Sequence, residues 1–332
     1  MSTPTRPATP APQPVTPTTP PAAQPEPTPC PRRRRRIDTL TTATALRRFA
    51  ALSVIANVAI VVTGGAVRLS DSGLGCPTWP RCTDASLTPT KQYAIHGVIE
   101  FSNRMLTVVL VLIAVATWAV AMVQRRERGL ATLALLGIPA QAVVGGLTVL
   151  TKLNPWLVAS HFLLSMVIVA VTFLLWWRLR DAPRRDSEPA VHPLARRLAE
   201  LTVLVTAGTL MIGTVVTGSG PHAGDKLEDG SIHRTGLNVA SVAQLHADVV
   251  MVLIGLTVGL VLLVRAVPSG PALRRASVVL LAIELAQGII GYTQYFLHVP
   301  PLLVGFHMFG ACLVWLAALT VFLRTRPLRT AA

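Results

Sequence analysis

Four histidines recur near the starts of long apolar segments, and imidazole nitrogen is a common ligand of protein-bound metals. They are His96, His161, His246 and His307. Two histidines that face each other across a helical bundle can hold haem iron from both sides. A catalytic zinc site usually needs a third protein ligand, and neither a His-x-x-x-His pair nor a cysteine cluster supplies one. The pattern therefore favours two haem positions, and a packed, hydrogen-bonded histidine is the alternative at each single position.

An acidic side chain lies one helical turn from the first of these histidines. Glu100 follows His96 by four residues, and Arg104 follows Glu100 by four. An ionisable residue in an apolar segment is a functional candidate, because a charge in lipid is costly. The same spacing also lets Glu100 and Arg104 pair with each other on one helix face. Glu100 is therefore our candidate catalytic residue, and a helix ion pair is the alternative that does not exclude that role.

Two cysteines lie close together in a segment that is rich in proline. Cys76 and Cys82 belong to the run Gly-Cys-Pro-Thr-Trp-Pro-Arg-Cys. The spacing is compatible with a small disulfide ring, which persists in an oxidising compartment, and two unpaired thiols are the alternative. A disulfide would shape this loop over the first haem position or exchange with a redox partner. Cys312 is expected to be a small apolar core residue, and Cys30 lies in a proline-rich N-terminal segment.

The composition argues against an ordinary soluble enzyme. Of the 332 residues, 52% are hydrophobic and only 14% are charged, with a mean hydropathy of +0.55. Soluble domains carry roughly 25% charged residues. The net charge of +15 is compatible with nucleic-acid binding, but the basic residues form short clusters between apolar runs. Such clusters are typical of membrane flanks, so we expect membrane lipid and no nucleic acid as a partner.

Eight apolar stretches are long enough to cross a bilayer, which takes about 20 residues of helix. Each must be helical there, because hydrocarbon offers no water to the backbone polar groups. The predicted fold class is an all-α polytopic membrane protein with eight transmembrane helices. The expected spans are residues 49–68, 93–121, 130–150, 157–177, 197–217, 242–264, 276–296 and 302–323.

The basic clusters alternate between the two sides of these spans, and the positive-inside rule assigns them to the cytoplasm. The loops that contain few basic residues are then outside, and both termini are expected to be cytoplasmic in a plasma-membrane protein. Residues 1–31 hold 12 of the 26 prolines, and a run of five arginines follows. Residues 1–44 are therefore expected to be a disordered cytoplasmic tail, with no signal-peptide cleavage site. The outer loops are expected at residues 69–92, 151–156, 218–241 and 297–301.

An internal repeat divides the spans into two halves. A proline follows both Gln141 and Gln287 by 14 residues, and a histidine follows each by 20, namely His161 and His307. Upstream the match is looser and aligns His96 with His246. We therefore expect the spans to form two pseudo-symmetric four-helix bundles in the same orientation, related by an axis along the membrane normal; recurrence of Gly, Pro and Leu by composition alone is the alternative. The domains are residues 45–180 and 197–325, joined by a cytoplasmic linker at 181–196.

The repeat is broken at the acid. Val250 and Ile254 occupy the positions that match Glu100 and Arg104 in the first half. Only one half is thus equipped for chemistry, and the other is expected to hold a cofactor. A second intramembrane acid, Glu284, is expected to be an interhelical hydrogen-bond partner.

Taken together, these features resemble the haem A synthase family, which oxidises haem O to haem A for cytochrome oxidase. The resemblance covers roughly residues 45–325. It is carried by Gly64-Gly-Ala-Val-Arg68, Gly75-Cys76-Pro-Thr-Trp-Pro, Ile99-Glu100-Phe-Ser-Asn103-Arg104, Thr217-Gly-Ser-Gly-Pro-His222-Ala-Gly-Asp225, Gln244-Leu-His246, and the two runs from Gln141 to His161 and from Gln287 to His307.

The resemblance implies haem b as an iron cofactor of the second half, with His246 and His307 as axial ligands. It implies haem O as the substrate of the first half, near Glu100 and His161. The methyl group at ring position C8 would become a formyl group by successive hydroxylations, with water as the oxygen source. Glu100 would act as a base or charge stabiliser beside the oxidised carbon.

The resemblance also implies partners and a disulfide. Cys76 and Cys82 match the outer-loop cysteine pair of the family. A haem O synthase would supply the substrate, an electron acceptor would remove the electrons, and a homo-oligomer is a possible assembly.

One residue departs from the family pattern. The family often has histidine at the position of Asn103, and asparagine is a poor haem ligand. His96 lies two helical turns earlier on the same face and is our candidate for the second axial ligand, with Arg104 and Asn103 also lining the substrate site. The alternative is a substrate haem held by His161 on one side only.

Two other function classes fit parts of the sequence. A di-haem b-type membrane electron carrier would have two equivalent sites and no need of Glu100. A haem transporter would need a cavity open to both sides, whereas the four histidines are all expected near one depth. The asymmetric acid favours the enzyme.

Overall fold

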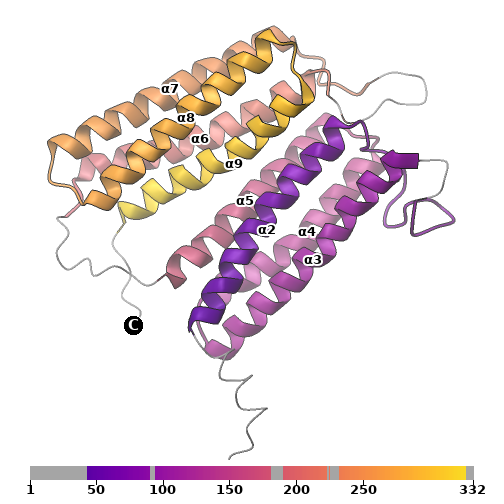
Figure 1. The fold of residues 1–332 in the computed structure, drawn as a ribbon, viewed down its shortest axis with the longest axis horizontal. Helices are drawn as coiled ribbons and strands as arrows, with labels where there is room; N and C mark the ends of the chain where they lie inside the picture. Colours follow the sequence, from indigo (N-terminus) through magenta and orange to yellow (C-terminus); the bar gives the residue numbers. More distant parts are fainter. Residues whose placement is uncertain (1–42, 90–93, 181–189, 223, 225–231, 327–332) are drawn as a thin grey trace, which may run out of the picture. The chain divides into compact units, whose positions relative to one another are not determined.

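The structure is a computed structural model that describes residues 43–89, 94–180, 190–222, 224 and 232–326 (Figure 1). The predicted disordered tail up to residue 42, the linker residues 181–189 and Cys30 lie outside the described residues.

The described residues form eight α-helices and no strand. All eight are long and apolar enough to cross a membrane, which confirms the predicted fold class. The helices extend beyond the predicted spans by up to about two turns, because the polar flanks continue the helical backbone past the apolar core. Their bounds are α2 Ala43–Leu69, α3 Ala94–Gln124, α4 Arg128–Leu150, α5 Pro155–Leu179, α6 Pro193–Ser219, α7 Val239–Ala266, α8 Pro271–Phe296 and α9 Pro301–Arg324.

Local sequence determines where several helices begin. Proline is the first residue of α5, α6, α8 and α9, a position where its missing N–H costs nothing. The Asn154 side chain accepts a hydrogen bond from the Trp156 N–H, and Asn238 accepts one from Ser241. These caps satisfy N–H groups that have no partner inside the helix.

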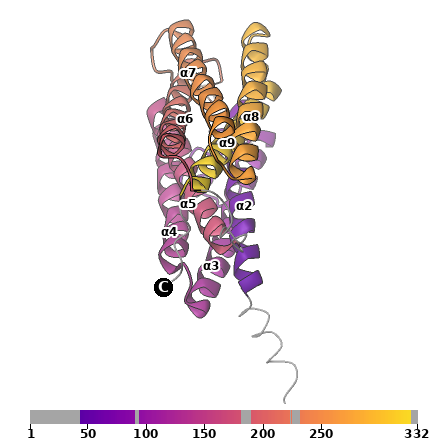
Figure 2. The same ribbon diagram turned by 90° about the vertical axis from the view of Figure 1, so that its left-hand side faces the viewer.

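The helices pack as two rings of four. Each of α2 to α5 contacts its neighbour in the chain, and α2 closes the ring against α5; helices α6 to α9 repeat this pattern. The rings meet where α2 contacts α9 and where α5 contacts α6 and α9, as Figures 1 and 2 show. Backbones of diagonal partners, such as α7 and α9, do not approach closely in the described residues. This arrangement is compatible with the predicted pair of four-helix bundles.

The two rings share a buried apolar cluster. It contains Val61, Met166, Val169, Cys312 and Trp315. The Trp315 indole N–H donates to the Met166 carbonyl at 3.0 Å, which joins α9 to α5. Cys312 is fully buried, as expected for a small core residue.

Glu284 is an interhelical hydrogen-bond partner, as predicted. Its side chain on α8 is 2% exposed, and the Thr257 hydroxyl on α7 donates to its Oε1 atom at 2.9 Å. The bond therefore ties two neighbouring helices inside the membrane span.

We expect this bond to be measurable as a coupling energy. Thr257→Val and Glu284→Met each remove it, so the double variant should lose less free energy of unfolding than the sum of the singles. The coupling should be about 0.6 kcal/mol and at most about 2 kcal/mol, because hydrogen bonds between membrane helices are modest. Unfolding in mixed detergent micelles measures it.

The control pairs Thr257→Val with Thr206→Val on α6. The Thr206 hydroxyl donates only within its own helix, to the Thr202 carbonyl. The effects of this pair should add. Additive effects for Thr257 and Glu284 would show that their bond contributes nothing.

Candidate functional site

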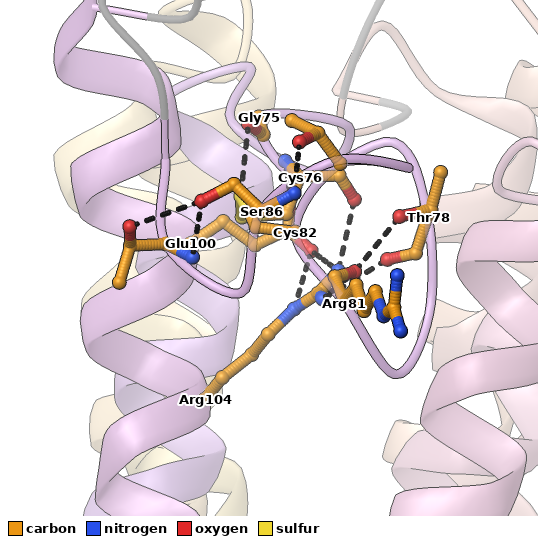
Figure 3. The surroundings of a disulfide bond; sticks show 10 residues. Gly75, Cys76, Thr78, Arg81, Cys82, Ser86, Glu100 and Arg104 are labelled. Atoms are coloured by element: carbon orange, nitrogen blue, oxygen red, sulfur yellow. Dashed lines mark hydrogen bonds and ion pairs between the residues drawn. A yellow bond between two sulfur atoms is a disulfide. The ribbon is translucent and has the colours of Figure 1, made fainter.

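A disulfide closes a small ring in the connection between α2 and α3. Cys76 and Cys82 are bonded, which confirms the predicted pairing. We call residues 75–86 the cysteine loop, and Figure 3 shows its surroundings. Both half-cystines are almost fully buried, at 0% and 1% exposure. The N–H groups of Cys82 and Thr83 both donate to the Ser86 carbonyl, so the chain turns back directly after the ring.

Glu100 lies beneath this ring and is 5% exposed. Its Oε2 atom accepts a hydrogen bond from the Cys76 backbone N–H at 2.6 Å. Its Oε1 atom accepts from the Arg104 guanidinium, at 3.1 Å from Nε and 2.5 Å from Nη2. The helix ion pair considered as an alternative is therefore present, and it is joined to the cysteine loop (Figure 3).

Arg104 also binds the ring directly. Its Nη1 atom donates to the carbonyls of Thr78 at 3.0 Å and Arg81 at 3.2 Å. Its Nη2 atom donates to the Cys76 carbonyl at 2.9 Å. One guanidinium thus joins the buried carboxylate to three carbonyls of the loop, as Figure 3 shows.

Two glycines let the cysteine loop lie close against the first ring of helices. A Cβ atom on Gly75 would lie 2.3 Å from the His96 carbonyl oxygen on α3. A Cβ atom on Gly146 of α4 would lie 2.4 Å from the Trp79 indole. The loop therefore rests on α3 and α4 through contacts that only glycine permits.

Three of the four predicted histidines lie at one depth. His161 is six residues into α5, His246 seven into α7 and His307 six into α9, which is about 9–10 Å along each helix. All three helices start at the end of the molecule that carries the cysteine loop, which we call the loop end.

Each of these imidazoles packs against a glycine of an adjacent helix. A Cβ atom would lie 3.0 Å from His161 Cε1 if added to Gly145, 3.2 Å from His246 Cε1 if added to Gly213, and 3.4 Å from His307 Cε1 if added to Gly291. The Nδ1 atoms of all three histidines are buried and have no hydrogen-bond partner among the described residues. Buried polar atoms are normally hydrogen-bonded, so the Nδ1 atoms of these packed rings are available to a ligand, while the His246 ring also has a hydrogen bond with the Thr209 backbone.

In the second ring of helices, the two histidines lie on diagonal helices. His246 on α7 and His307 on α9 are at the same depth, although the backbones of these two helices stay apart. No group of three His, Cys, Asp or Glu side chains that could hold a metal ion is found among the described residues. Two imidazoles at one depth on diagonal helices, without a third protein ligand in the described residues, fit haem iron, which takes its other four ligands from the porphyrin.

His96 and Asn103 differ from what the repeat alignment predicts. His96 is only two residues into α3, is exposed, and has its Nδ1 atom 2.9 Å from the Ser72 hydroxyl. Asn103 lies opposite Gly64 of α2 and accepts a hydrogen bond from Thr63 at 2.8 Å. His246 packs in the same way against Gly213 of α6, which is the first helix of the second half. Asn103 and His246 therefore occupy matching places in the two halves. The alignment of His96 with His246 is displaced by two helical turns, a shift that keeps a residue on the same face.

Sequence reasoning missed the roles of Arg68 and Gln141. Arg68, at the end of α2, donates to the Thr217 carbonyl at 2.9 Å and to the His222 carbonyl at 2.5 Å, and so links the two halves. Gln141 donates to the His161 carbonyl at 3.1 Å and to Ser165 at 2.6 Å. The recurrence of glutamine at positions 141 and 287 could have indicated a role for Gln141. The role of Arg68 could not be predicted in this way, because its partners are backbone carbonyls, which every residue has.

Comparison with known proteins places these features in a family context. A profile of the family described as COX15-CtaA, cytochrome oxidase assembly protein, matches residues 47–319. The protein named "Heme A synthase" of Shewanella oneidensis is 29% identical over 180 residues, which cover 49% of this chain and 54% of that protein. The protein of the same name from Lysinibacillus sphaericus is 31% identical over 179 residues, covering 52% and 57%.

A third relative, from Geobacillus thermodenitrificans, also has this name. It is 32% identical over 136 residues, which cover 40% of this chain and 42% of that protein. The chain thus matches about half the length of these curated relatives.

The contact between Gly75 and α3 predicts a local effect of a single methyl group. Gly75→Ala should push the cysteine loop away from α3, because the clash is with backbone that cannot move aside. Trypsin should then cut after the exposed Arg81 several-fold faster than in the unaltered protein, since cleavage follows local opening. Gly129→Ala, where a Cβ atom meets nothing within 4 Å, is the control. Equal cleavage rates in all three proteins would contradict the close packing.

Proposed function

The chain belongs to the COX15-CtaA family of cytochrome oxidase assembly proteins. From this premise we propose that it is a haem A synthase, which is a membrane oxidoreductase that converts haem O to haem A. The observation that carries the proposal is the asymmetry between its halves. The first half holds a buried glutamate joined to a disulfide, and the second half has Ala243 at the position that matches Glu100 once Asn103 is aligned with His246. The relatives named "Heme A synthase" support the same activity.

The second half is proposed to bind haem b. His246 and His307 would be its axial ligands, since they lie at one depth on diagonal helices of the ring and their Nδ1 atoms have no partner in the described residues. When bound, the haem would supply a one-electron carrier beside the substrate half. Gly213 and Gly291 would keep the two imidazoles in place by contact.

The first half is proposed to bind haem O, with His161 at the iron and Glu100 near the reacting carbon. Conversion of the C8 methyl group to a formyl group takes one oxygen atom from water and releases four electrons and four protons. It would proceed by successive hydroxylations, and an electron acceptor would take the electrons. Positive charge develops on a carbon that loses electrons, and a preorganised anion stabilises it. Glu100 already accepts hydrogen bonds on both oxygens, which favours the charge-stabilising role over that of a mobile base.

For the second axial position of the substrate iron, the geometry supports the one-sided alternative. His96 is exposed, is hydrogen-bonded to Ser72, and lies four residues nearer its helix start than His161 does, which is about one turn nearer the loop end. The Asn103 amide is engaged with Thr63. We therefore propose that His161 alone ligates haem O, which leaves the other face of the iron open.

The proposed setting is the plasma membrane. The basic clusters of the sequence favour cytoplasmic termini, which would put the cysteine loop in the oxidising outer compartment, where a disulfide persists. A haem O synthase, an electron acceptor, membrane lipid and a second copy of the chain are the proposed partners.

The first test is haem analysis by mass. The protein is produced with a haem O source, purified, and its haems are extracted and identified. We expect haem A or a hydroxylated intermediate in the unaltered protein, and only haem O and haem b in Glu100→Ala. Glu284→Gln, which alters the intramembrane acid of the other half, is the matched control and should still yield product. Haem b alone in every sample would instead support a di-haem electron carrier.

A second test distinguishes the ligand sets by absorption spectroscopy and haem retention. His246→Ala and His307→Ala should each remove the six-coordinate haem b spectrum, because one axial ligand is lost. His161→Ala should abolish haem O retention, while His96→Ala should leave it within about twofold of the unaltered protein. Equal loss in His96→Ala and His161→Ala would favour two histidine ligands at the substrate iron.

A further inference from the structure

Arg104 uses every hydrogen-bond donor that its side chain possesses. A guanidinium has five N–H groups in a fixed fork. Nε and one N–H of Nη2 donate to Glu100, the other N–H of Nη2 donates to Cys76, and the two of Nη1 donate to Thr78 and Arg81. No donor is left over for a substrate or cofactor. The contacts therefore describe a clamp rather than a binding group.

All three carbonyls in this clamp belong to the disulfide ring. Cys76, Thr78 and Arg81 lie between the two half-cystines or at one of them, and closure of the ring brings their carbonyls to one point (Figure 3). An open chain of seven residues would have to lose its conformational freedom to converge in the same way. The five-point contact thus requires the closed ring.

The same ring also holds the second oxygen of the acid. The Cys76 N–H donates to Glu100 Oε2, while Arg104 holds Oε1. The carboxylate is therefore fixed from one side by the arginine and from the other by the ring. Opening the ring would release both restraints together.

We propose that Arg104 is a positioning residue for Glu100 that acts through the closed Cys76–Cys82 ring, so that the oxidation state of this disulfide controls the placement of the acid. Lysine cannot replace Arg104, because an ammonium group has three donors without the planar fork. The inference rests on the proposed function only where product is measured. The clamp itself is testable without any haem.

The direct test is the rate at which dithiothreitol opens the disulfide. The dithiol breaks the S–S bond, two protein thiols form, and the dithiol becomes a cyclic disulfide. Because both half-cystines are buried, reduction requires the loop to leave its site. The full chain with Cys30→Ser and Cys312→Ala is used, so that only the ring cysteines react with a maleimide–polyethylene glycol label.

Arg104→Gln and Arg104→Lys should both be reduced faster, by on the order of tenfold, because access to the sulfur governs the rate. Arg81→Gln is the matched control. It removes an arginine of the same ring but keeps the carbonyl that Arg104 binds, and it should stay within about twofold. An unchanged rate in Arg104→Gln, or full restoration by Arg104→Lys, would overturn the clamp.

The second readout is haem product in the same preparations. Arg104→Lys and the double change Cys76→Ser with Cys82→Ser should each lower the yield of oxidised haem, and the triple variant should be no worse than either. Additive losses would overturn action through the ring. If the unaltered protein makes no oxidised haem while the reduction rates follow the expected order, the proposed function fails and the clamp stands.

Discussion

A charge inside a membrane protein must find its counter-charge and its hydrogen bonds within the protein, because hydrocarbon supplies neither. The Glu100–Arg104 pair meets this constraint by drawing in the cysteine loop, whose backbone provides an N–H for the carboxylate and carbonyls for the guanidinium. The loop, the disulfide and the start of α3 together supply the hydrogen-bond partners of these two charged side chains. The three deep histidines differ from this pair. Their rings are packed against glycines, and their Nδ1 atoms have no hydrogen-bond partner among the described residues.

The two halves have similar helix packing and different polar contents. The first contains the ion pair, the disulfide ring and one deep histidine; the second contains two histidines at one depth on diagonal helices. Between them, Trp315 bonds to Met166 within the shared apolar cluster, and Arg68 reaches carbonyls of the second half at the loop end. This division is compatible with duplication of a four-helix unit, followed by loss or gain of polar residues in one copy.

Much of the fold follows from the sequence, because a helix that crosses hydrocarbon needs a long apolar run that can be counted. The depth of His161, His246 and His307 also follows, since the repeat places them at equal distances from helix starts. The position of His96 could not be obtained in this way. A shift of seven residues preserves the helix face, so Ile-His and Leu-His pairs align although they lie at different depths.

The clamp formed by Arg104 was equally out of reach of the sequence. Its i, i+4 spacing with Glu100 indicates an ion pair, but three of its bonds go to backbone carbonyls, which every residue carries. The spacing of the two cysteines was enough to predict the disulfide. It could not show that carbonyls of the disulfide ring accept hydrogen bonds from one arginine.

The glycine contacts have a consequence for altering this protein. The contacts at Gly145, Gly213 and Gly291 form a graded series, with a hypothetical Cβ atom 3.0, 3.2 and 3.4 Å from the nearest imidazole carbon. At Gly145 and Gly213 one added methyl group obliges a neighbour to yield by a few tenths of an ångström, whereas at Gly291 it meets nearly ordinary van der Waals contact, and the tightly packed interior transmits any shift. The tilt of each imidazole can thus be varied from α4, α6 or α8 while every nitrogen-bearing side chain is left untouched.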